Sequence, residues 1–220
     1  MGEYIVPDRT RAALVTVGVQ NDYTKATSPY RSPGATHAVP NMVRLAEGFR
    51  ASGDPIFHAL RLYRPDGSNV DLCRRSAVEE GMRILMPGTM GAELATELRG
   101  EDAPRSDPQQ LFSGEFQELR AGEYLFYKPR WGAFHGTELD RELNDRGINT
   151  LVICGCNFST ATRATIYEAS AHDFRVILAT DAVCDVSEDN LRELGRMGVY
   201  LMNTDSCLHW VGGERVKNAA

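Results

Sequence analysis

The amino-acid sequence predicts an α/β fold, a three-layer sandwich in which helices cover both faces of a mostly parallel central sheet. Two observations predict it. Short apolar segments with the composition of buried strands alternate with amphipathic segments of roughly 10–15 residues. Polar residues directly follow several of the apolar segments, as they do where a buried parallel strand ends. Strand–helix–strand units connect right-handedly, so they build a parallel sheet with helices on both sides.

Each predicted element follows from a local pattern. Residues 12–19 form an apolar run that ends in a polar cluster, as expected for a buried strand. Residues 39–51 carry apolar side chains at helical spacing, and Gly53 follows as a stop signal. The remaining predicted elements are, in order, strands at 55–60 and 124–127, a helix at 137–146 closed by Gly147, a strand at 150–154, a helix at 159–171, a strand at 175–179, a helix at 187–197 and a strand at 199–202.

The segment 64–110 interrupts this alternation. It is rich in glycine, proline and charged residues, and its helical pieces are short. Within a compact α/β domain, such a long excursion is more often a functional lid or an oligomer contact than a linker. The sequence has no internal repeat, low-complexity segment or domain boundary. A single domain is therefore predicted over residues 1–220, a length that suffices to bury a substantial core.

Composition and charge exclude several classes of protein. The formal net charge is −6 and the isoelectric point is about 5.4, which disfavours nucleic-acid binding because phosphates require a basic surface. No apolar run approaches the roughly 20 residues that cross a bilayer. Residues 1–4 do not begin a signal peptide. The five cysteines (73, 154, 156, 184 and 207) do not form the usual CxxC pattern, so we expect free thiols in a cytoplasmic protein.

Polar clusters follow three of the predicted strands, at residues 20–23, 61–66 and 156–158. In an open α/β sheet, ligands bind beyond the carboxyl ends of the strands. We therefore expect the three clusters to meet in one crevice. The alternative for each cluster alone is an ordinary solvated loop.

Three segments resemble a known family. They are residues 16–23 (TVGVQNDY), 127–134 (YKPRWGAF) and 154–163 (CGCNFSTATR), and they are similar to the catalytic segments of the isochorismatase-like cysteine hydrolases. The resemblance covers essentially the whole chain and includes residues 61–75. It implies a Rossmann-like, isochorismatase-like fold. The branch that matches best has a Pro-Asn-Cys-Pro turn where this chain has residues 159–162, Ser-Thr-Ala-Thr.

The resemblance also implies that the catalytic triad is degraded. The family uses an Asp, a Lys and usually a Cys; Lys128 is in place, but Gly18 aligns with the Asp and Ala161 with the Cys. A nucleophilic Cys needs a thiolate and a group that accepts its proton. Ala161 has no nucleophilic atom and Gly18 has no side chain, so hydrolysis by the family route is excluded. Relatives that cleave a vinyl ether without the Cys still depend on the Asp.

Five side chains are candidates for chemistry in this altered site. Lys128 follows an apolar strand, and burial without the Asp would lower its pKa, which suits a general acid or base; the alternative is a solvent-facing Lys. Asp22 could replace the missing carboxylate or could cap a turn. Ser159 and Thr160 could present hydroxyl groups to a substrate oxygen or could cap a helix. Cys156 could act as a substitute nucleophile or could be a buried thiol at a strand end.

A further set of side chains is predicted to bind the substrate. Arg130 and Arg163 could hold an anionic or carbonyl group by paired hydrogen bonds. Four aromatic residues could form a wall of the pocket, although each could equally belong to the core. The family resemblance also implies a cis peptide bond at Cys156–Asn157. The predicted substrate-binding residues are Gln20, Tyr23, Arg61, Arg130, Trp131, Phe134, Asn157, Phe158 and Arg163.

No metal or other cofactor is predicted. Some relatives, the nicotinamidases, bind zinc through an Asp-x-His segment and a further His, but the five histidines here (37, 58, 135, 172 and 209) are dispersed and no Asp-x-His triplet occurs. The expected partner is a small-molecule substrate, not nucleic acid or a membrane. The family resemblance implies a homodimer or homotetramer, and the excursion 64–110 is the candidate contact.

Three functions remain open at the level of sequence. The first is an enzyme with reassigned, non-hydrolytic acid/base chemistry. In it, Lys128 catalyses proton transfer, elimination, cyclisation or rearrangement of a small carbonyl-containing metabolite. Its setting would be antibiotic or other specialised-metabolite biosynthesis. The second is a non-catalytic small-molecule-binding or scaffold protein. The third is a residual amide, ester or vinyl-ether hydrolase that uses Cys156 or a water oriented by Asp22.

Overall fold

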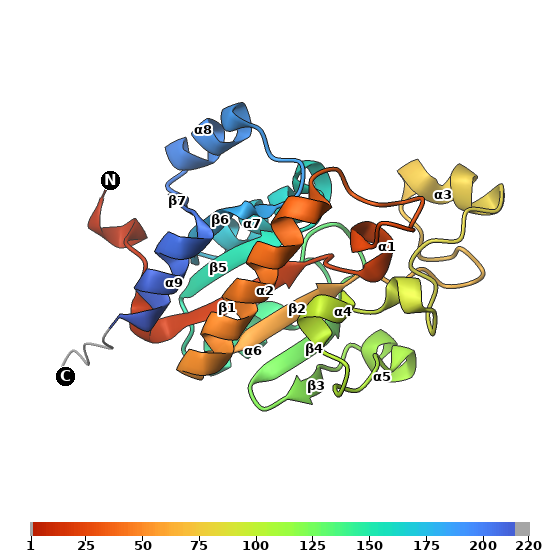
Figure 1. Cartoon of the computed structure of the whole chain (residues 1–220), viewed down its shortest axis with the longest axis horizontal. Helices are drawn as coiled ribbons and strands as arrows, with labels where there is room; N and C mark the ends of the chain where they lie inside the picture. The colour runs from red at the N-terminus through yellow and green to blue at the C-terminus, as the bar shows by residue number, and fades with distance from the viewer. Residues whose placement is uncertain (1, 214–220) are drawn as a thin grey trace.

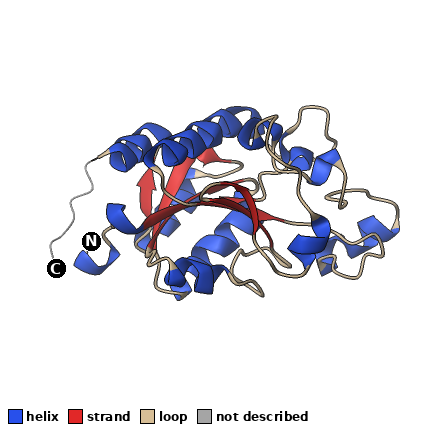
Figure 2. Cartoon of the chain, turned by 90° about the horizontal axis from the view of Figure 1, so that it is seen from below, coloured by secondary structure: helices blue, strands red, loops and turns tan. Residues whose placement is uncertain are grey.

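The chain folds into a seven-stranded sheet with helices on both faces (Figure 1, Figure 2). The structure is a computed structural model that describes residues 2–213. The strand order is β3-β4-β2-β1-β5-β6-β7; the edge strand β3 is antiparallel to β4, and the other pairs are parallel. The predicted α/β class is thus confirmed. The strands are β1 (Ala12–Val17), β2 (Ile56–Leu60), β3 (Gln117–Arg120), β4 (Glu123–Tyr127), β5 (Thr150–Gly155), β6 (Arg175–Val183) and β7 (Tyr200–Met202).

Two hydrophobic clusters, one on each face of the sheet, account for the three layers. Helices α2 and α9 pack on one face, and α6, α7 and α8 contribute to the cluster on the other. The helices are α1 (Asn21–Thr24), α2 (Ala35–Ser52), α3 (Leu72–Glu79), α4 (Thr96–Arg99), α5 (Pro108–Phe112), α6 (Leu139–Asp145), α7 (Arg163–Ala171), α8 (Glu188–Arg196) and α9 (Thr204–Gly212). Short 3₁₀ turns lie at η1 (Glu3–Ile5), η2 (Arg9–Arg11) and η3 (Met90–Ala92), and a π-helical turn at η4 (Phe158–Thr162).

The predicted elements all occur, with different boundaries at several ends. Helix α2 begins four residues before the predicted start and includes Pro40, which the apolar spacing alone does not anticipate. Gly53 ends this helix in the left-handed conformation, as predicted (φ 70°). The predicted helix at 159–171 is regular only from Arg163, because η4 precedes it. Strand β3 and helix α9 were not predicted.

A chain of buried polar side chains crosses three central strands. Thr16 Oγ1 lies 2.7 Å from His58 Nδ1, and His58 Nε2 lies 2.8 Å from a carboxylate oxygen of Glu123. Arg50 of α2 donates two hydrogen bonds of 2.8 Å to the same carboxylate. Burial alone would raise the pKa of Glu123, but the bonds from Arg50 and His58 outweigh it and hold that pKa well below its ordinary value. The chain fixes β1, β2 and β4 to one another and to α2.

The excursion between β2 and β3 begins beyond the carboxyl end of β2 and then runs along α2, where Arg50 donates to Leu98 O of α4 (2.6 Å). Its helices α3, α4 and α5 are short, and Figure 1 shows α3 on the same side of the sheet as α1, which follows β1. Its role as a functional lid or an oligomer contact stays a prediction. Within the described chain, no helix is both long and apolar enough to cross a membrane.

Candidate active site

Four neighbouring parallel strands deliver the first residues of the site. In the order β4-β2-β1-β5, the residues directly after the strands are Lys128, Arg61, Gly18 and Cys156. Backbone hydrogen bonds keep them in register: Lys128 N donates to Leu60 O (2.9 Å), Gly18 N to Ala59 O (3.0 Å) and Cys156 N to Val17 O (2.9 Å). Because the strands are parallel, their carboxyl ends meet at one edge, and the four residues line one cavity.

Lys128 is almost fully buried in this cavity, with 2% of its surface exposed. Its Nζ donates hydrogen bonds to the carbonyl oxygens of Arg130 (3.0 Å) and Trp131 (2.9 Å). Burial lowers the pKa of Lys128 to about 7, and the nearby Arg61 contributes in the same direction. The amine therefore exchanges between its neutral and charged forms close to neutral pH, as predicted from its position after an apolar strand.

A hydrogen-bonded group from the excursion forms the opposite wall. Arg74 of α3 donates to the hydroxyl oxygens of Tyr23 (2.7 Å) and Tyr63 (3.2 Å), and the Tyr63 hydroxyl donates to Asp71 Oδ2 (2.8 Å). Arg61 Nη2 lies 3.5 Å from the same Asp71 oxygen, and its guanidinium stacks over the Tyr63 ring at 4.4 Å. Burial raises the pKa of both Tyr23 and Tyr63, so both phenols stay protonated.

The two positions that carry no functional side chain lie in the same cavity. Gly18, Ala161, Asn157 and Thr160 line it together with Lys128. Gly18 has a φ of +65°, and an added Cβ would find Cys156 O as its nearest neighbour at 3.7 Å, so there is space in front of it. The cavity has a volume of about 20 Å³, which is room for about one water molecule.

The segment after β4 is held in place by α7. The Glu168 carboxylate accepts hydrogen bonds from the backbone N–H groups of Phe134 (2.9 Å) and His135 (3.3 Å), and Thr165 Oγ1 accepts one from Ala133 N (3.1 Å). Gly132 is required at this contact because an added Cβ would lie 2.0 Å from the Glu168 carboxylate. These bonds fix the carbonyl groups that Lys128 uses.

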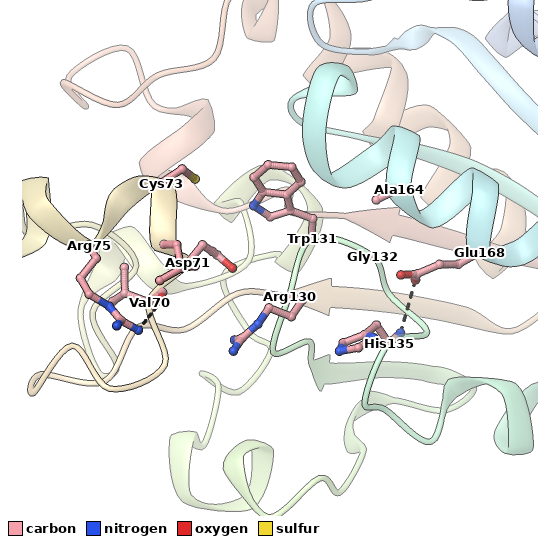
Figure 3. A pocket seen from close by; sticks show the side chains of 11 residues that line it. Val70, Asp71, Cys73, Arg75, Arg130, Trp131, Gly132, His135, Ala164 and Glu168 are labelled. Atoms are coloured by element: carbon pink, nitrogen blue, oxygen red, sulfur yellow. Dashed lines mark hydrogen bonds between the residues drawn. The ribbon is translucent and has the colours of Figure 1, made fainter.

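A larger cavity of about 790 Å³ lies next to the inner one and shares Asp71 and Trp131 with it. Figure 3 shows Trp131, Arg130 and Asp71 on its walls, with Glu168 facing His135. The Trp131 side chain is 42% exposed. The outer cavity is large enough for a small metabolite, whereas the inner one is not.

Sequence comparison assigns this arrangement to a family, because the isochorismatase domain model matches residues 12–206. The chain belongs to the isochorismatase family. Among similar proteins, a probable inactive nicotinamidase of Arabidopsis thaliana is 27% identical over 85% of this chain and 89% of its own. The N-carbamoylsarcosine amidase of an Arthrobacter species is 26% identical over 91% of this chain and 71% of its own. The crystal structure of an isochorismatase-family protein from Desulfovibrio vulgaris has a TM-score of 0.75 and 30% identity, covering 89% of this chain and 95% of that one.

Two predicted residues next to β1 have structural roles instead of lying in the cavity. The Asp22 carboxylate accepts a hydrogen bond of 2.6 Å from Leu85 N and packs against Gly91, so it ties α1 to the excursion. The Gln20 side chain bonds the backbone of Arg61 through both its oxygen and its nitrogen (2.9 Å each) and also donates to Ala92 O (2.6 Å). Neither Asp22 nor Gln20 lines the inner cavity, so the structure does not bring these two predicted residues together with Lys128.

Four other predicted residues also lie outside the inner cavity. Phe134 stacks on His172 at 5.0 Å and Phe158 is buried in the core, so both belong to the second hydrophobic cluster. Arg163 forms an ion pair with Glu193 of α8 on the outer surface. Ser159 is exposed and does not line either cavity.

The remaining predictions divide between the two cavities. Arg61, Tyr23, Asn157 and Thr160 line the inner cavity, Arg130 lines the outer one and Trp131 lines both; their roles toward a substrate stay predictions. The Arg130 guanidinium donates to Pro129 O (2.7 Å).

Cys156 lines the cavity but is not an activated thiol. Its Sγ lies 3.3 Å from Cys184 Sγ; this hydrogen bond and burial raise the pKa of Cys156 well above its ordinary value. The expected cis peptide bond at Cys156–Asn157 is wrong: the described chain has none, and Asn157 instead takes a left-handed conformation (φ 64°), which asparagine tolerates better than most residues.

The sequence-based prediction missed three wall residues: Tyr63, Asp71 and Arg74. Tyr63 lies within the polar cluster after β2, which was a usable signal. Asp71 and Arg74 come from the excursion, where no strand end marks them. Within residues 2–213, no group of three His, Cys, Asp or Glu side chains could hold a metal ion.

Proposed function

We propose that this isochorismatase-family protein is an enzyme in which Lys128 transfers protons to or from a small carbonyl-containing metabolite without hydrolysing it. The observation that carries the proposal is a buried lysine, with a pKa lowered to about 7, in a cavity that Gly18 and Ala161 line without a functional side chain. A group with this pKa serves equally as an acid or a base at neutral pH.

Several features support non-hydrolytic chemistry over the thiol route. Ala161 offers no nucleophile, and the raised pKa of Cys156 keeps its thiol protonated. Asp22 is bonded to Leu85 N and does not face the cavity, so it does not orient a water there. Proton transfer, elimination, cyclisation and rearrangement need only an acid/base group and a means of holding the substrate oxygen, for which the Thr160 hydroxyl and the Asn157 amide are available.

The proposal can be tested without knowing the natural substrate. A panel of small keto acids, keto esters and cyclic enones is incubated with the protein in D₂O, and deuterium incorporation next to the carbonyl group is followed by NMR and mass spectrometry. We expect exchange or conversion of at least one compound, lost in Lys128→Met and retained in Lys25→Met, a control on the surface. If Lys128→Met converts the same compound at the wild-type rate, Lys128 is not the catalytic group.

A non-catalytic binding protein is the second candidate. It is favoured by the loss of two of the three family side chains and by the similarity to a plant protein described as a probable inactive nicotinamidase. A ligand that binds tightly, is recovered unchanged and shows no exchange in D₂O would favour this function. A residual hydrolase is tested separately with an acyl probe, since a covalent adduct on Cys156 by mass spectrometry would support it. The biosynthetic setting, like the homo-oligomeric state, is a proposal that rests on the range of the family.

A further inference from the structure

The inner cavity has an excess of positive charge. Its ionisable lining residues are three bases (Arg61, Arg74 and Lys128), one carboxylate (Asp71), two phenols and the Cys156 thiol. Two of the bases are permanently charged, and both phenols and the thiol are held in their neutral forms. Glu168 of α7 also acts electrostatically on Lys128, but it lines the outer cavity, and its carboxylate accepts bonds from the backbone of the loop after β4. A single carboxylate therefore faces three basic groups.

That carboxylate is already engaged. Asp71 Oδ2 accepts the Tyr63 hydroxyl at 2.8 Å and lies 3.5 Å from Arg61 Nη2. Donors without a partner remain: among the described residues, Arg61 Nε is buried and makes no hydrogen bond. The charged form of Lys128 has three N–H groups, of which two bond the carbonyl groups of Arg130 and Trp131. A buried unpaired donor is costly, so these groups favour an acceptor in the cavity.

The space for such an acceptor lies at the positions without functional side chains. An added Cβ at Gly18 meets nothing closer than 3.7 Å, and Ala161 lies on the same cavity. A carboxylate is planar and negatively charged, which suits a narrow space beside basic groups. A phosphate is tetrahedral and larger, and its second charge would be repelled by Asp71.

From this arrangement we infer that the natural ligand carries a carboxylate, which enters the space beside Gly18 and Ala161 and becomes the counter-ion of Lys128. The inference rests on the proposed function for the choice of this cavity as the site. The body of the ligand lies in the outer cavity of about 790 Å³. Asp71 and Trp131 belong to both cavities and so join the two parts of the site, and Trp131 is 42% exposed. The ligand thereby supplies the negative charge that the protein side chain at position 18 does not.

A proton accompanies this binding. The neutral and charged forms of Lys128 are both present near pH 7, and a carboxylate beside Nζ favours the charged form. At pH 8 most of the free protein holds neutral Lys128, so binding takes up nearly one proton. At pH 6 Lys128 is already charged, and the uptake falls toward zero. Lys128 is then charged in the complex and acts as the acid.

The test is calorimetric and independent of turnover. Acetate, benzoate and cyclohexanecarboxylate are titrated into the protein at pH 6 and pH 8. Each titration is done in two phosphate-free buffers, one of low and one of high ionisation enthalpy. Benzamide serves as the uncharged analogue of benzoate, and inorganic phosphate is titrated separately as the competing anion. We expect at least one carboxylate to bind about 10- to 100-fold more tightly than benzamide, the range of a charge-assisted hydrogen bond. Proton uptake should occur at pH 8, disappear in Lys128→Met and persist in Lys25→Met.

Two matched variants place the carboxylate. Gly18→Asp introduces an internal carboxylate beside the same space and should abolish binding of the carboxylate probes, whereas Gly18→Asn has the same shape without the charge and should retain measurable binding. Circular dichroism confirms that both variants fold. Equal affinity for benzoate and benzamide, tighter binding of phosphate, no binding of any carboxylate at the solubility limit, or unchanged binding in Gly18→Asp each overturns the inference. Carboxylate binding with proton uptake but no Lys128-dependent conversion overturns only the proposed function.

Discussion

The burial of Lys128 predicts a specific dependence of stability on pH. In the folded chain Lys128 has a pKa of about 7, whereas its ordinary value of 10.5 applies when the chain unfolds. Between these values the unfolded chain binds more protons at this site than the folded chain, so the site makes folding less favourable, and stability rises as pH increases from 7 toward 10.5. The cost is fully present below pH 7.

The magnitude follows from the two pKa values. A shift of one unit corresponds to about 1.4 kcal/mol, and linkage over both titrations gives a cost of about 4 kcal/mol at pH 7 that falls to about 2 kcal/mol at pH 9. Lys128→Met removes this titration but also removes hydrogen bonds from two carbonyl groups, which costs about 1–3 kcal/mol each if they stay dry. The net stability of the variant at one pH is therefore less informative than its change with pH.

The assay is urea unfolding at pH 7 and pH 9 for the wild type, Lys128→Met and Lys25→Met. The free energy of unfolding of the wild type, relative to Lys128→Met, should increase by about 2 kcal/mol from pH 7 to pH 9. Thiols and other groups that titrate in this range are common to both proteins and cancel. Lys25 lies at the surface in an ion pair with Glu97, and Lys25→Met serves as the matched control. A constant difference between wild type and Lys128→Met would mean that the folded-state pKa of Lys128 is not lowered, and the reasoning about its acid/base role would fail.

Three further outcomes are expected. Glu123 has a pKa held below its ordinary value, so its stabilising effect is present above about pH 4.5 and is lost as pH falls. In urea unfolding, Glu123→Gln should lower the free energy of unfolding by about 3–5 kcal/mol at pH 7 and should make that free energy fall less steeply in acid. Equal midpoints of acid unfolding for the two proteins would contradict this. Cys156 is buried and protonated, whereas Cys73 is exposed. A thiol reagent should therefore modify the native protein rapidly at Cys73 and slowly at Cys156, as followed by peptide mass spectrometry. Comparable rates at the two residues would refute the raised pKa of Cys156. Gly132→Ala places a Cβ against the Glu168 carboxylate and should lower the stability of the fold by about 1–3 kcal/mol, measured by thermal melting. In the control Gly2→Ala, the added Cβ has no atom within 4 Å, so the melting temperature should not change. An unchanged melting temperature in Gly132→Ala would show that the Glu168 side chain moves freely.

Strand-end positions were predictable because hydrophobic runs locate strands and parallel strands share an edge. Lys128 and Arg61 follow this logic, since the residue directly after a strand stays close to the strand axis. One or two turns further along, the same logic fails. Asp22 and Phe158 follow strand ends too, yet α1 and η4 turn their side chains toward the excursion and the core. Strand position gives the edge of the sheet, but not the direction of a side chain in the loop beyond it.

The wall that the excursion contributes could not be derived from periodicity. Arg74 lies on α3, a helix without buried residues, and it reaches the cavity only because the preceding segment folds back over β2 and places Asp71 beside Arg61. Tertiary contacts, not local pattern, determine this placement. The pairing of Cys156 with Cys184 has the same origin, because it joins residues 28 positions apart at the ends of β5 and β6.

The left-handed conformation of Gly18 has a consequence for protein engineering. In that conformation an L-residue costs about 1 kcal/mol or more, so an aspartate placed there would begin with a strained backbone. A thiol placed at position 161 would lack a base unless that strain were relieved. A variant designed for thiol hydrolysis would therefore need a carboxylate at position 18, a thiol at position 161 and a local change of backbone together, and neither substitution alone would suffice.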